Sequence, residues 1–321
     1  MKVLLGQNIH EQAINLLKEN GLKIEISPSP EDEVVREHIA DADAIIVRTA
    51  TKLSRETIQT AQKLKVIGRT GAGVDNVDIK AASDNNIPVC NAPEANTSTV
   101  AEHAVCFMLT LAKDLKSMDA AVRAGNWKIR YNYTPVDISE KTLGLVGFGK
   151  IGRTTARMCV QAFGMDIITY DPFLGSDVDV DFSYDMVDTL DELFSKADFV
   201  SLHIPYTREN HHIVGKKLIE KMKKSAFLIN TSRGGLVDES ALARALSDGT
   251  IAGAALDVFE DEPPEEDNPV LASDKVILSP HSAALTKESS ARMAVHAAQG
   301  VIDVLNNRKP TWVFNIKDIR L

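Results

Sequence analysis

Short apolar runs alternate with amphipathic stretches along most of the chain. In the first hundred residues the apolar runs predict strands at residues 2–5, 22–26, 44–48, 65–67 and 88–90. Helical spacing of apolar positions is found between them, at residues 11–20 and 55–61. Because strands that alternate with helices are typical of parallel sheets, this pattern predicts an α/β unit.

The same alternation returns in the second half of the chain. A long helical pattern covers residues 99–124, and the loop-like residues 125–139 that follow include Trp127, Tyr131 and Tyr133. Later apolar runs predict strands at residues 142–146, 165–170, 199–203, 226–229, 251–257 and 276–278. The sequence therefore predicts two doubly wound parallel-sheet domains, one Rossmann-like and one flavodoxin-like.

The length of 321 residues also favours two domains, because a single hydrophobic core rarely grows this large. Residues 288–305 are helical again, although the second unit already has a full set of strands by residue 278. We therefore expect the end of the chain to return to the first unit. This predicts a discontinuous substrate domain of residues 1–97 plus 287–321, a cofactor domain of residues 98–286, and a substrate cleft between them.

The most informative segment spans residues 143–152 and reads LGLVGFGKIG. An apolar strand there leads into Gly147, Gly149 and Gly152, and a second strand delivers Asp171 about 20 residues later. The first glycine permits a tight turn, the second lets the backbone approach a pyrophosphate, and the third lets the next helix lie close to the strand. Glycine clusters usually mark ordinary turns, but the strand-helix-strand context here predicts a dinucleotide site.

Asp171 indicates which dinucleotide is bound. A carboxylate at the end of the second strand accepts hydrogen bonds from the ribose hydroxyls of NAD and repels the additional phosphate of NADP. Pro172, Phe173 and Leu174, which follow, supply no cation. The sequence therefore predicts NAD, with a simple Asp-Pro turn as the alternative interpretation of Asp171.

The formal net charge of −9 argues against nucleic acid or an acidic membrane surface as the main partner. No segment approaches the roughly 20 apolar residues of a membrane span, and the first apolar run is too short for a signal peptide, so a cytoplasmic protein is expected. Cys90, Cys106 and Cys159 are odd in number and widely spaced, which favours buried thiols over disulfides or metal ligands. The eight histidines show no metal-ligand spacing, and His211 and His212 are expected in a polar loop. No metal is predicted.

Arg233, Glu262 and His281 each follow one of the predicted strands of the second unit. In an open α/β sheet ligands bind outside the carboxyl ends of the strands, so the three side chains are expected at one rim. His281 fits the acid/base of a hydride transfer, Glu262 is placed to support its other ring nitrogen, and Arg233 offers a two-pronged grip on a carboxylate. Taken singly, each has an ordinary explanation as surface charge. Together they favour a catalytic site.

With these motifs the chain resembles the NAD-dependent D-2-hydroxyacid dehydrogenases, and within that family it is most similar to the D-3-phosphoglycerate dehydrogenases. The resemblance runs over nearly the full length and includes residues 47–52, 68–78, 91–93 and 100–103, beside the glycine motif and the three rim segments. It implies hydride transfer to or from C2 of a D-2-hydroxy acid. Arg233 would bind the substrate, Glu262 would support the histidine, and His281 would be the acid/base.

The resemblance also implies ligand contacts elsewhere in the chain. The backbone of Ala72, Gly73 and Val74 would receive the substrate carboxylate, and Asp257 would reach the carboxamide of the nicotinamide. The dinucleotide would further be lined by Lys150, Ile151, Ile204, Pro205, Thr231, Ser232, Ser282 and Ala283. Such enzymes are usually homodimers joined through their cofactor domains, with a helix and arm like residues 100–133 at the interface.

Arg48, Lys52 and Arg69 lie in segments that resemble the family's substrate-facing loops. Three cations in an acidic protein suit a phosphate, so we expect 3-phosphoglycerate and a place in serine biosynthesis, with hydroxypyruvate or glyoxylate reduction as the alternative. Solvated surface charge is the other interpretation, and it is weaker for Arg48, which directly follows an apolar run. Lys128 and Arg130 of a neighbouring subunit are weaker candidates for additional positive charge at this phosphate site.

Two differences from other members of the family narrow the expected substrate and regulation. Glu262 is an acid where the formate dehydrogenases of the family carry an amide, so formate is disfavoured. The chain lacks the C-terminal regulatory extension of many phosphoglycerate dehydrogenases, so serine feedback through such a domain is not expected. A different class of function also stays open, because relatives include NAD-binding transcriptional corepressors, although the chain has no long tail or basic region that favours this role.

Overall fold

Two compact units make up the computed structural model, which describes residues 1–131, 135–175 and 178–320. One unit combines Met1–Asn96 with Leu285–Leu321, and the other is Thr97–Ala284. No helix in the described part of the chain is long and apolar enough to cross a membrane.

The discontinuous unit is built on a five-stranded parallel sheet in the order β2-β1-β3-β4-β5. This is the flavodoxin-like doubly wound order, and it confirms the predicted α/β class. The strands are β1 (Lys2–Leu5), β2 (Lys23–Ile26), β3 (Ala44–Val47), β4 (Val66–Arg69) and β5 (Val89–Cys90). The helices are α1 (Glu11–Glu19), α2 (Asp32–Ile39), α3 (Arg55–Thr60), α4 (Ile79–Asp84) and α11 (Lys287–Leu305).

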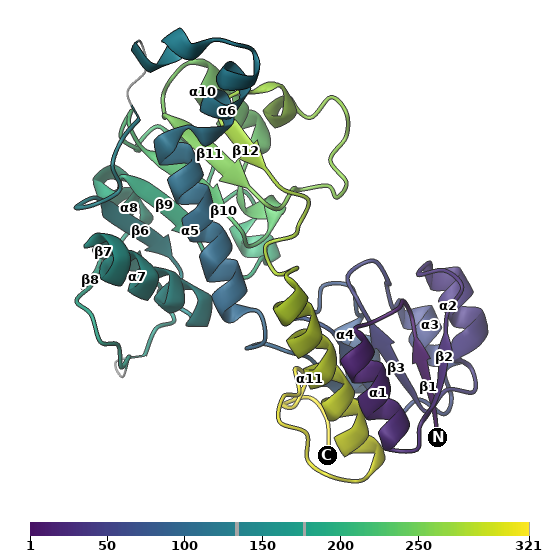
Figure 1. The fold of residues 1–321 in the computed structure, drawn as a ribbon. Helices are drawn as coiled ribbons and strands as arrows, with labels where there is room; N and C mark the ends of the chain where they lie inside the picture. The colour runs from purple at the N-terminus through teal and green to yellow at the C-terminus, as the bar shows by residue number, and fades with distance from the viewer. Residues whose placement is uncertain (132–134, 176–177, 321) are drawn as a thin grey trace. The chain divides into compact units, whose positions relative to one another are not determined.

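Helices cover both faces of this sheet. In β1, Val3 and Leu5 pack with α1 and α11, whereas Leu4 packs with the helices of the opposite face. Because successive strand residues point to opposite faces, an unbroken apolar run signals a sheet buried on both sides. Figure 1 shows α11 beside α1, and Val301 and Ile302 of α11 are fully buried there. The helix near the end of the chain thus completes the core of the first unit.

The other unit contains a seven-stranded parallel sheet in the order β12-β11-β10-β9-β6-β7-β8. This is the Rossmann order with one additional strand, and the order reverses between β6 and β9. The strands are β6 (Thr142–Val146), β7 (Asp166–Tyr170), β8 (Asp185–Met186), β9 (Phe199–Leu202), β10 (Phe227–Asn230), β11 (Gly253–Leu256) and β12 (Val276–Leu278). The helices are α5 (Thr97–Lys113), α6 (Leu115–Arg123), α7 (Lys150–Phe163), α8 (Leu190–Lys196), α9 (Lys216–Ile219) and α10 (Glu239–Ser247), with short 3-10 turns η1 (Trp127–Tyr131), η2 (Arg208–Asn210), η3 (Gly234–Leu236) and η4 (Pro269–Ala272).

Two apolar clusters hold this sheet between its helices. Phe148 and Phe199 are buried with α5 and α7 on one face, and Phe194 is buried with α8 and α10 on the other. β8 was not predicted, because it is an exposed strand of only two residues and has no apolar run.

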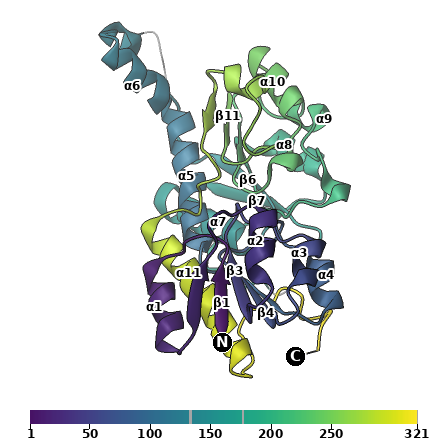
Figure 2. The same cartoon turned by 90° about the vertical axis from the view of Figure 1, so that its right-hand side faces the viewer.

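The helical pattern predicted at residues 99–124 forms two helices rather than one. Asp114, between α5 and α6, has a left-handed φ of 42°, which a continuous right-handed helix does not allow. Figure 2 shows α6 projecting from the end of α5, and α6 has no buried residue. Leu115 and Val122 are 54% and 52% exposed, so α6 carries apolar surface that its own unit does not cover.

The expectation of three buried thiols is correct for Cys90 and Cys159 and wrong for Cys106. Burial raises the pKa of the Cys90 and Cys159 thiols to about 12. Cys106 lies on α5 beside the buried Phe107, but on the side of the helix that faces away from the sheet. An apolar neighbourhood in sequence does not tell the two sides of a helix apart unless the period is followed residue by residue.

His203 follows β9, and its ring Nε2 lies 3.0 Å from the hydroxyl of Ser201. Burial lowers the pKa of His203 to about 4 from an ordinary value of 6.5. The unfolded chain binds a proton at this histidine near pH 6.5, whereas the folded chain binds it only near pH 4. The free energy of unfolding is therefore highest above pH 6.5 and falls as the pH drops towards 4.

We predict that acidification from pH 7 to pH 5 lowers the free energy of unfolding by about 2 kcal/mol through His203 alone. The His203→Gln variant cannot titrate, so its stability should fall by that much less over the same interval. Urea unfolding of both proteins at the two pH values measures the difference. Equal losses in the wild type and the variant would contradict the assignment.

Candidate active site

The three glycines of the sequence motif form the turn between β6 and α7. Gly147 has a φ of +96°, and a Cβ there would come within 2.7 Å of the carbonyl oxygen of His203. A Cβ at Gly152 would lie 2.5 Å from the carbonyl oxygen of Gly147. At Gly149, by contrast, a Cβ would meet no atom within 4 Å. The first and third glycines serve internal packing, and the second leaves the backbone open to an approaching group.

The N-terminus of α7 begins at this turn. Its N-cap is Gly149, which has no side chain that could accept from the first-turn N–H groups. First-turn N–H groups have no partner inside a helix, and the positive end of the helix dipole favours an anion. The turn therefore fits the pyrophosphate of a dinucleotide.

Asp171 comes directly after β7 and is tied to the glycine turn. One carboxylate oxygen accepts a hydrogen bond from the N–H of Phe148 at 2.9 Å, and the other accepts from the N–H of Phe173 at 3.0 Å. Each oxygen keeps a further lone pair for another donor. The carboxylate is thus held beside the turn in a position that suits a ribose diol, and it also forms the Asp-Pro turn of the alternative interpretation.

Arg233, Glu262 and His281 lie in the loops after β10, β11 and β12. These strands are neighbours, and the register pairs Asn230 with Leu256 and Leu256 with Leu278. The three strands therefore end level with one another, and their loops start side by side.

Asp257 organises the loop after β12. It is only 1% exposed, and its carboxylate accepts hydrogen bonds from the hydroxyl of Ser279 and from the N–H groups of Ser282 and Ala283, at 2.8 and 2.9 Å for the latter two. Its carbonyl oxygen accepts from the N–H of His281 at 2.7 Å. Because a buried carboxylate has to be satisfied, these bonds fix the turn in which His281 has a φ of +50°.

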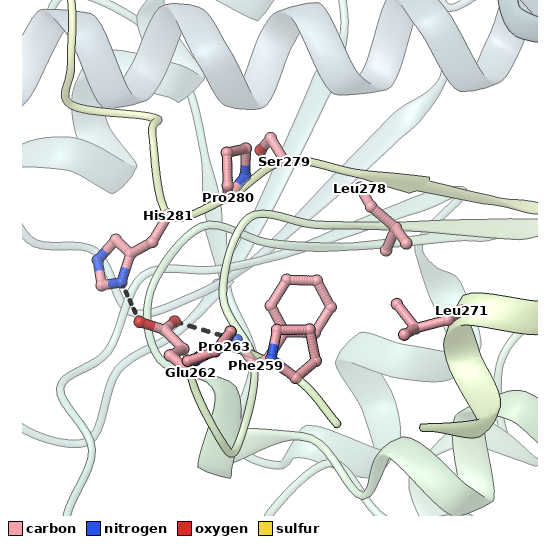
Figure 3. Close-up of a pocket in the computed structure, with 9 residues that line it drawn as sticks. Phe259, Glu262, Pro263, Leu271, Leu278, Ser279, Pro280 and His281 are labelled. Atoms are coloured by element: carbon pink, nitrogen blue, oxygen red, sulfur yellow. Dashed lines mark hydrogen bonds and ion pairs between the residues drawn. The ribbon is translucent and has the colours of Figure 1, made fainter. Parts of the chain in front are cut away.

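Glu262 supports the ring of His281. The Nδ1 atom of His281 lies 2.7 Å from one carboxylate oxygen, and the other oxygen accepts from the N–H of Phe259 at 3.2 Å (Figure 3). Burial alone would raise the pKa of Glu262, but its bonds to His281 and Phe259 and the charges of His281 and Arg233 lower it. Glu262 is therefore ionised at neutral pH. With Nδ1 donating to it, Nε2 of His281 is the ring nitrogen that stays available for proton transfer.

Arg233 is held next to the same loop. Its Nη1 donates a hydrogen bond to the carbonyl oxygen of Ser232 at 2.7 Å. The next residue, Gly234, packs so closely on the backbone of Phe259 that a Cβ would come within 1.8 Å of it. This contact brings the loop of Arg233 to the loop of Glu262, which explains why the arginine charge acts on that carboxylate.

The remaining predicted dinucleotide residues of this unit also lie after strands or at the start of α7. The Ser232 hydroxyl donates to the carbonyl oxygen of Leu202 at 2.7 Å and so joins the ends of β9 and β10. Lys150 and Ile151 begin α7, Ile204 and Pro205 follow β9, and Thr231 and Ser232 follow β10, whereas Ser282 and Ala283 follow β12.

A mostly apolar cavity of about 470 Å³ adjoins the His281–Glu262 pair. Figure 3 shows the pair at one side of the cavity, with Leu271 and Leu278 at the other. The cavity is lined by Phe259, Glu262, Pro263, Pro264, Leu271, Leu278, Ser279, Pro280 and His281. The apolar wall contributes to the burial of Glu262.

Sequence reasoning did not assign two residues that support this rim. His103 on α5 lies 3.1 Å from the hydroxyl of Ser279 through Nε2, and burial lowers its pKa against the opposing charge of Asp257. Glu239 at the start of α10 accepts a hydrogen bond from the N–H of Glu260 at 2.9 Å. His103 stood in a family-like segment, but Glu239 looks like any acidic residue in a first helical turn.

The substrate residues predicted in the other unit lie at the carboxyl edge of its own sheet. Val47 pairs with Arg69, so Arg48 and Arg69 sit at the ends of neighbouring strands. Arg48 Nη1 donates to the carbonyl oxygen of Asn8 at 3.2 Å, and Arg69 Nη2 donates to the hydroxyl of Thr49 at 3.3 Å. The two guanidinium groups are thus anchored at one edge of this sheet.

The loop after β4 contains Ala72, Gly73 and Val74. The carbonyl oxygen of Ala72 accepts from the side-chain amide of Asn91 at 2.7 Å, which ties this loop to the end of β5. Lys52 is exposed on the loop after β3.

Comparison with known proteins assigns the family. The family model described as D-isomer specific 2-hydroxyacid dehydrogenase, NAD binding domain, matches residues 105–283. The D-3-phosphoglycerate dehydrogenase of Methanocaldococcus jannaschii is 41% identical over 319 residues, which are 99% of this chain and 60% of that protein. The glyoxylate reductase of Korarchaeum cryptofilum is 34% identical over 326 residues, with 100% of this chain and 97% of that protein covered.

Solved structures agree with this assignment. A D-lactate dehydrogenase from Aquifex aeolicus, complexed with NAD and lactic acid, is 29% identical with a TM-score of 0.83, and the match covers 96% of each chain. The chain spans 50 to 60% of the length of the first three phosphoglycerate dehydrogenases that it matches. It belongs to the D-isomer specific 2-hydroxyacid dehydrogenase family and contains the NAD-binding domain of that family.

Proposed function

We propose that this protein transfers a hydride between NAD and C2 of a D-2-hydroxy acid, with 3-phosphoglycerate and its 2-keto form as the first substrate pair. The observation that carries the proposal is the 2.7 Å contact of His281 with an ionised Glu262. The positive charge of Arg233 also helps to keep Glu262 ionised. This is an acid/base pair next to a carboxylate-binding cation, which is what reduction of a 2-keto acid requires.

Each of the three residues has a distinct part in the proposed reaction. In reduction, Nε2 of protonated His281 donates a proton to the keto oxygen, and in oxidation it takes the proton of the hydroxyl group. Glu262 accepts the hydrogen bond from Nδ1 and stabilises the charged ring. Arg233 binds the carboxylate of the substrate and orients C2. NAD supplies or accepts the hydride when it is bound at the glycine turn.

The cofactor contacts follow the glycine turn and the strand ends. The turn at Gly149 and the N-terminus of α7 would hold the pyrophosphate, and Asp171 would hold the adenosine ribose. Asp257 would present Ser282 and Ala283 to the nicotinamide end, because its own oxygens already hold the backbone of these two residues.

The acid/base assignment predicts a selective effect of His281→Gln. Turnover should fall by about 10² to 10⁴-fold, because the proton donor is lost, while the dissociation constant of NADH changes by less than about twofold. NADH absorbance with 3-phosphohydroxypyruvate measures the first quantity, and NADH fluorescence measures the second. His38→Gln in the other unit is the matched control and should leave both unchanged. Turnover within about tenfold of the wild type would contradict the role of His281.

A phosphate site formed by Arg48 and Arg69 predicts discrimination between substrates. Each change to Ala should lower kcat/KM for 3-phosphohydroxypyruvate by about 10 to 100-fold and leave hydroxypyruvate within about twofold, because a charge-assisted hydrogen bond to the phosphate is lost. Arg55→Ala is the control, since Arg55 is paired with Asp78 and Asp84. Equal losses for both acids would remove the phosphate site.

A second candidate function is the reduction of glyoxylate or hydroxypyruvate. One observation favours it: a glyoxylate reductase is 34% identical to this chain over 326 residues. The mechanism would be the same, without a phosphate on the substrate. A wild-type enzyme that prefers the unphosphorylated keto acid would establish this alternative.

We also propose that the protein is a cytoplasmic homodimer joined through α6 and η1. Trp127 and Tyr131 of η1, which contacts α6, are 63% and 74% exposed, beside the exposed Leu115 and Val122 of α6. Large apolar side chains exposed together are typical of an interaction surface. Tyr133, at the end of the predicted interface segment, lies outside the described residues. The cytoplasmic location is supported by the three cysteines, which form no disulfide.

A charge in this apolar surface should break the dimer. We predict that Leu115→Glu or Val122→Glu converts the protein to monomers at micromolar concentration, because an interface core does not tolerate an unpaired charge. Sedimentation velocity measures the mass. Phe173→Glu, at a site that is 95% exposed outside α6, should leave the mass unchanged. Variants with the mass of the wild type, or a monomeric wild type, would contradict the proposed interface.

A further inference from the structure

Two histidines and one carboxylate meet on the surface of the NAD-binding unit. His211 and His212 follow η2, and Glu260 lies in the loop after β11. His212 Nε2 is 2.8 Å from one oxygen of Glu260, and His211 Nε2 is 3.6 Å from the other. The two imidazole rings are stacked with their centroids 3.8 Å apart. Spacing along the chain cannot show this group, because Glu260 lies 48 residues after His212.

The separations suit one metal ion. One ligand atom from each of the three residues lies within 4.8 Å of the other two. Ligand atoms about 2.0 to 2.1 Å from a tetrahedral ion are about 3.3 Å apart, so His212 Nε2 and the Glu260 oxygen, 2.8 Å apart, would separate slightly on binding. The stacked imidazole rings would also have to turn out of their parallel arrangement to direct both Nε2 lone pairs at one ion, and both side chains are exposed enough to turn.

The surroundings keep the ligand atoms in place. The hydroxyl of Tyr206 lies 3.2 Å from Nδ1 of His211 and can accept a hydrogen bond from it when Nε2 binds a metal. The N–H of His212 donates to the carbonyl oxygen of Gly235 at 2.8 Å, and the N–H of Glu260 donates to Glu239 at 2.9 Å. Both loops are thus anchored by their backbones, while the ligating side chains remain able to turn.

We propose that His211, His212 and Glu260 bind one divalent transition-metal ion of the Zn²⁺ type through both Nε2 atoms and the carboxylate. Two imidazoles and a carboxylate are a ligand set used by Zn²⁺ in proteins, and the side chains are 43%, 33% and 38% exposed, so that water can complete the coordination. The ion would join the loop after η2 to the loop that also carries Glu262. Its role is structural, and it does not depend on the proposed reaction.

The test is metal binding by the full chain after removal of bound metal with a chelator. Zn²⁺ is titrated by calorimetry, and Co²⁺ is used as a spectroscopic probe. The wild type should bind one ion, with the visible absorption that Co²⁺ shows on tetrahedral nitrogen and oxygen ligands. His212→Gln and His211→Gln should weaken binding at least about tenfold. Glu260→Gln should do the same while preserving the size of the side chain and its backbone hydrogen bond, so it tests the site if a histidine variant fails to fold.

Two controls separate this site from other histidines. His38→Gln removes a histidine that lies 2.7 Å from a single carboxylate, Glu25, and should leave binding unchanged. His281→Gln removes the proposed acid/base and should also leave it unchanged. No binding by the wild type, loss of binding in His281→Gln, or full binding in the three ligand variants would overturn the proposal.

Discussion

The arrangement of the candidate active site in the loops after β10, β11 and β12 depends on the buried carboxylate of Asp257. β12 is followed by a turn in which the N–H groups of Ser282 and Ala283 donate to Asp257, the residue directly after the neighbouring strand β11. Leaving such buried donors without an acceptor costs about 1 to 3 kcal/mol each. The position of His281 is therefore set by the neighbouring strand, because its N–H also bonds to the carbonyl oxygen of Asp257.

Burial and charge act in opposite directions on Glu262. The apolar cavity wall favours the neutral acid, whereas the hydrogen bond from His281 and the charge of Arg233 favour the carboxylate. The second effect is larger, chiefly because His281 both donates a hydrogen bond to Glu262 and carries charge beside it, while Arg233 makes the smallest contribution. Gly234 lets the loop of Arg233 lie directly on Phe259, and a larger residue there would move that charge away from Glu262.

The periodic features of the fold could be predicted from the sequence. The run at residues 142–146 is β6, and the unbroken apolar character of the runs reflects sheets covered on both faces. Two local exceptions were missed. The break at Asp114 is a single backbone rotation inside a continuous helical pattern, and no change of period marks it. Cys106 differs from its buried neighbours in the side of α5 on which it lies, which only the helical period followed residue by residue can show.

The residues of the candidate site also fall into two groups, those that the strand pattern predicts and those that only tertiary packing brings to the site. Arg233, Glu262 and His281 could be predicted because strand ends mark the ligand edge of a parallel sheet. The supports could not, because Glu239 meets Glu260 only through the packing of α10 beside the loop after β11. That loop is held at Glu260 by Glu239 and at Glu262 by His281, two residues apart on one short segment. Because the two contacts hold one short segment, a change at Glu239 would alter the position of Glu262, and with it the contact to His281, through the backbone between Glu260 and Glu262.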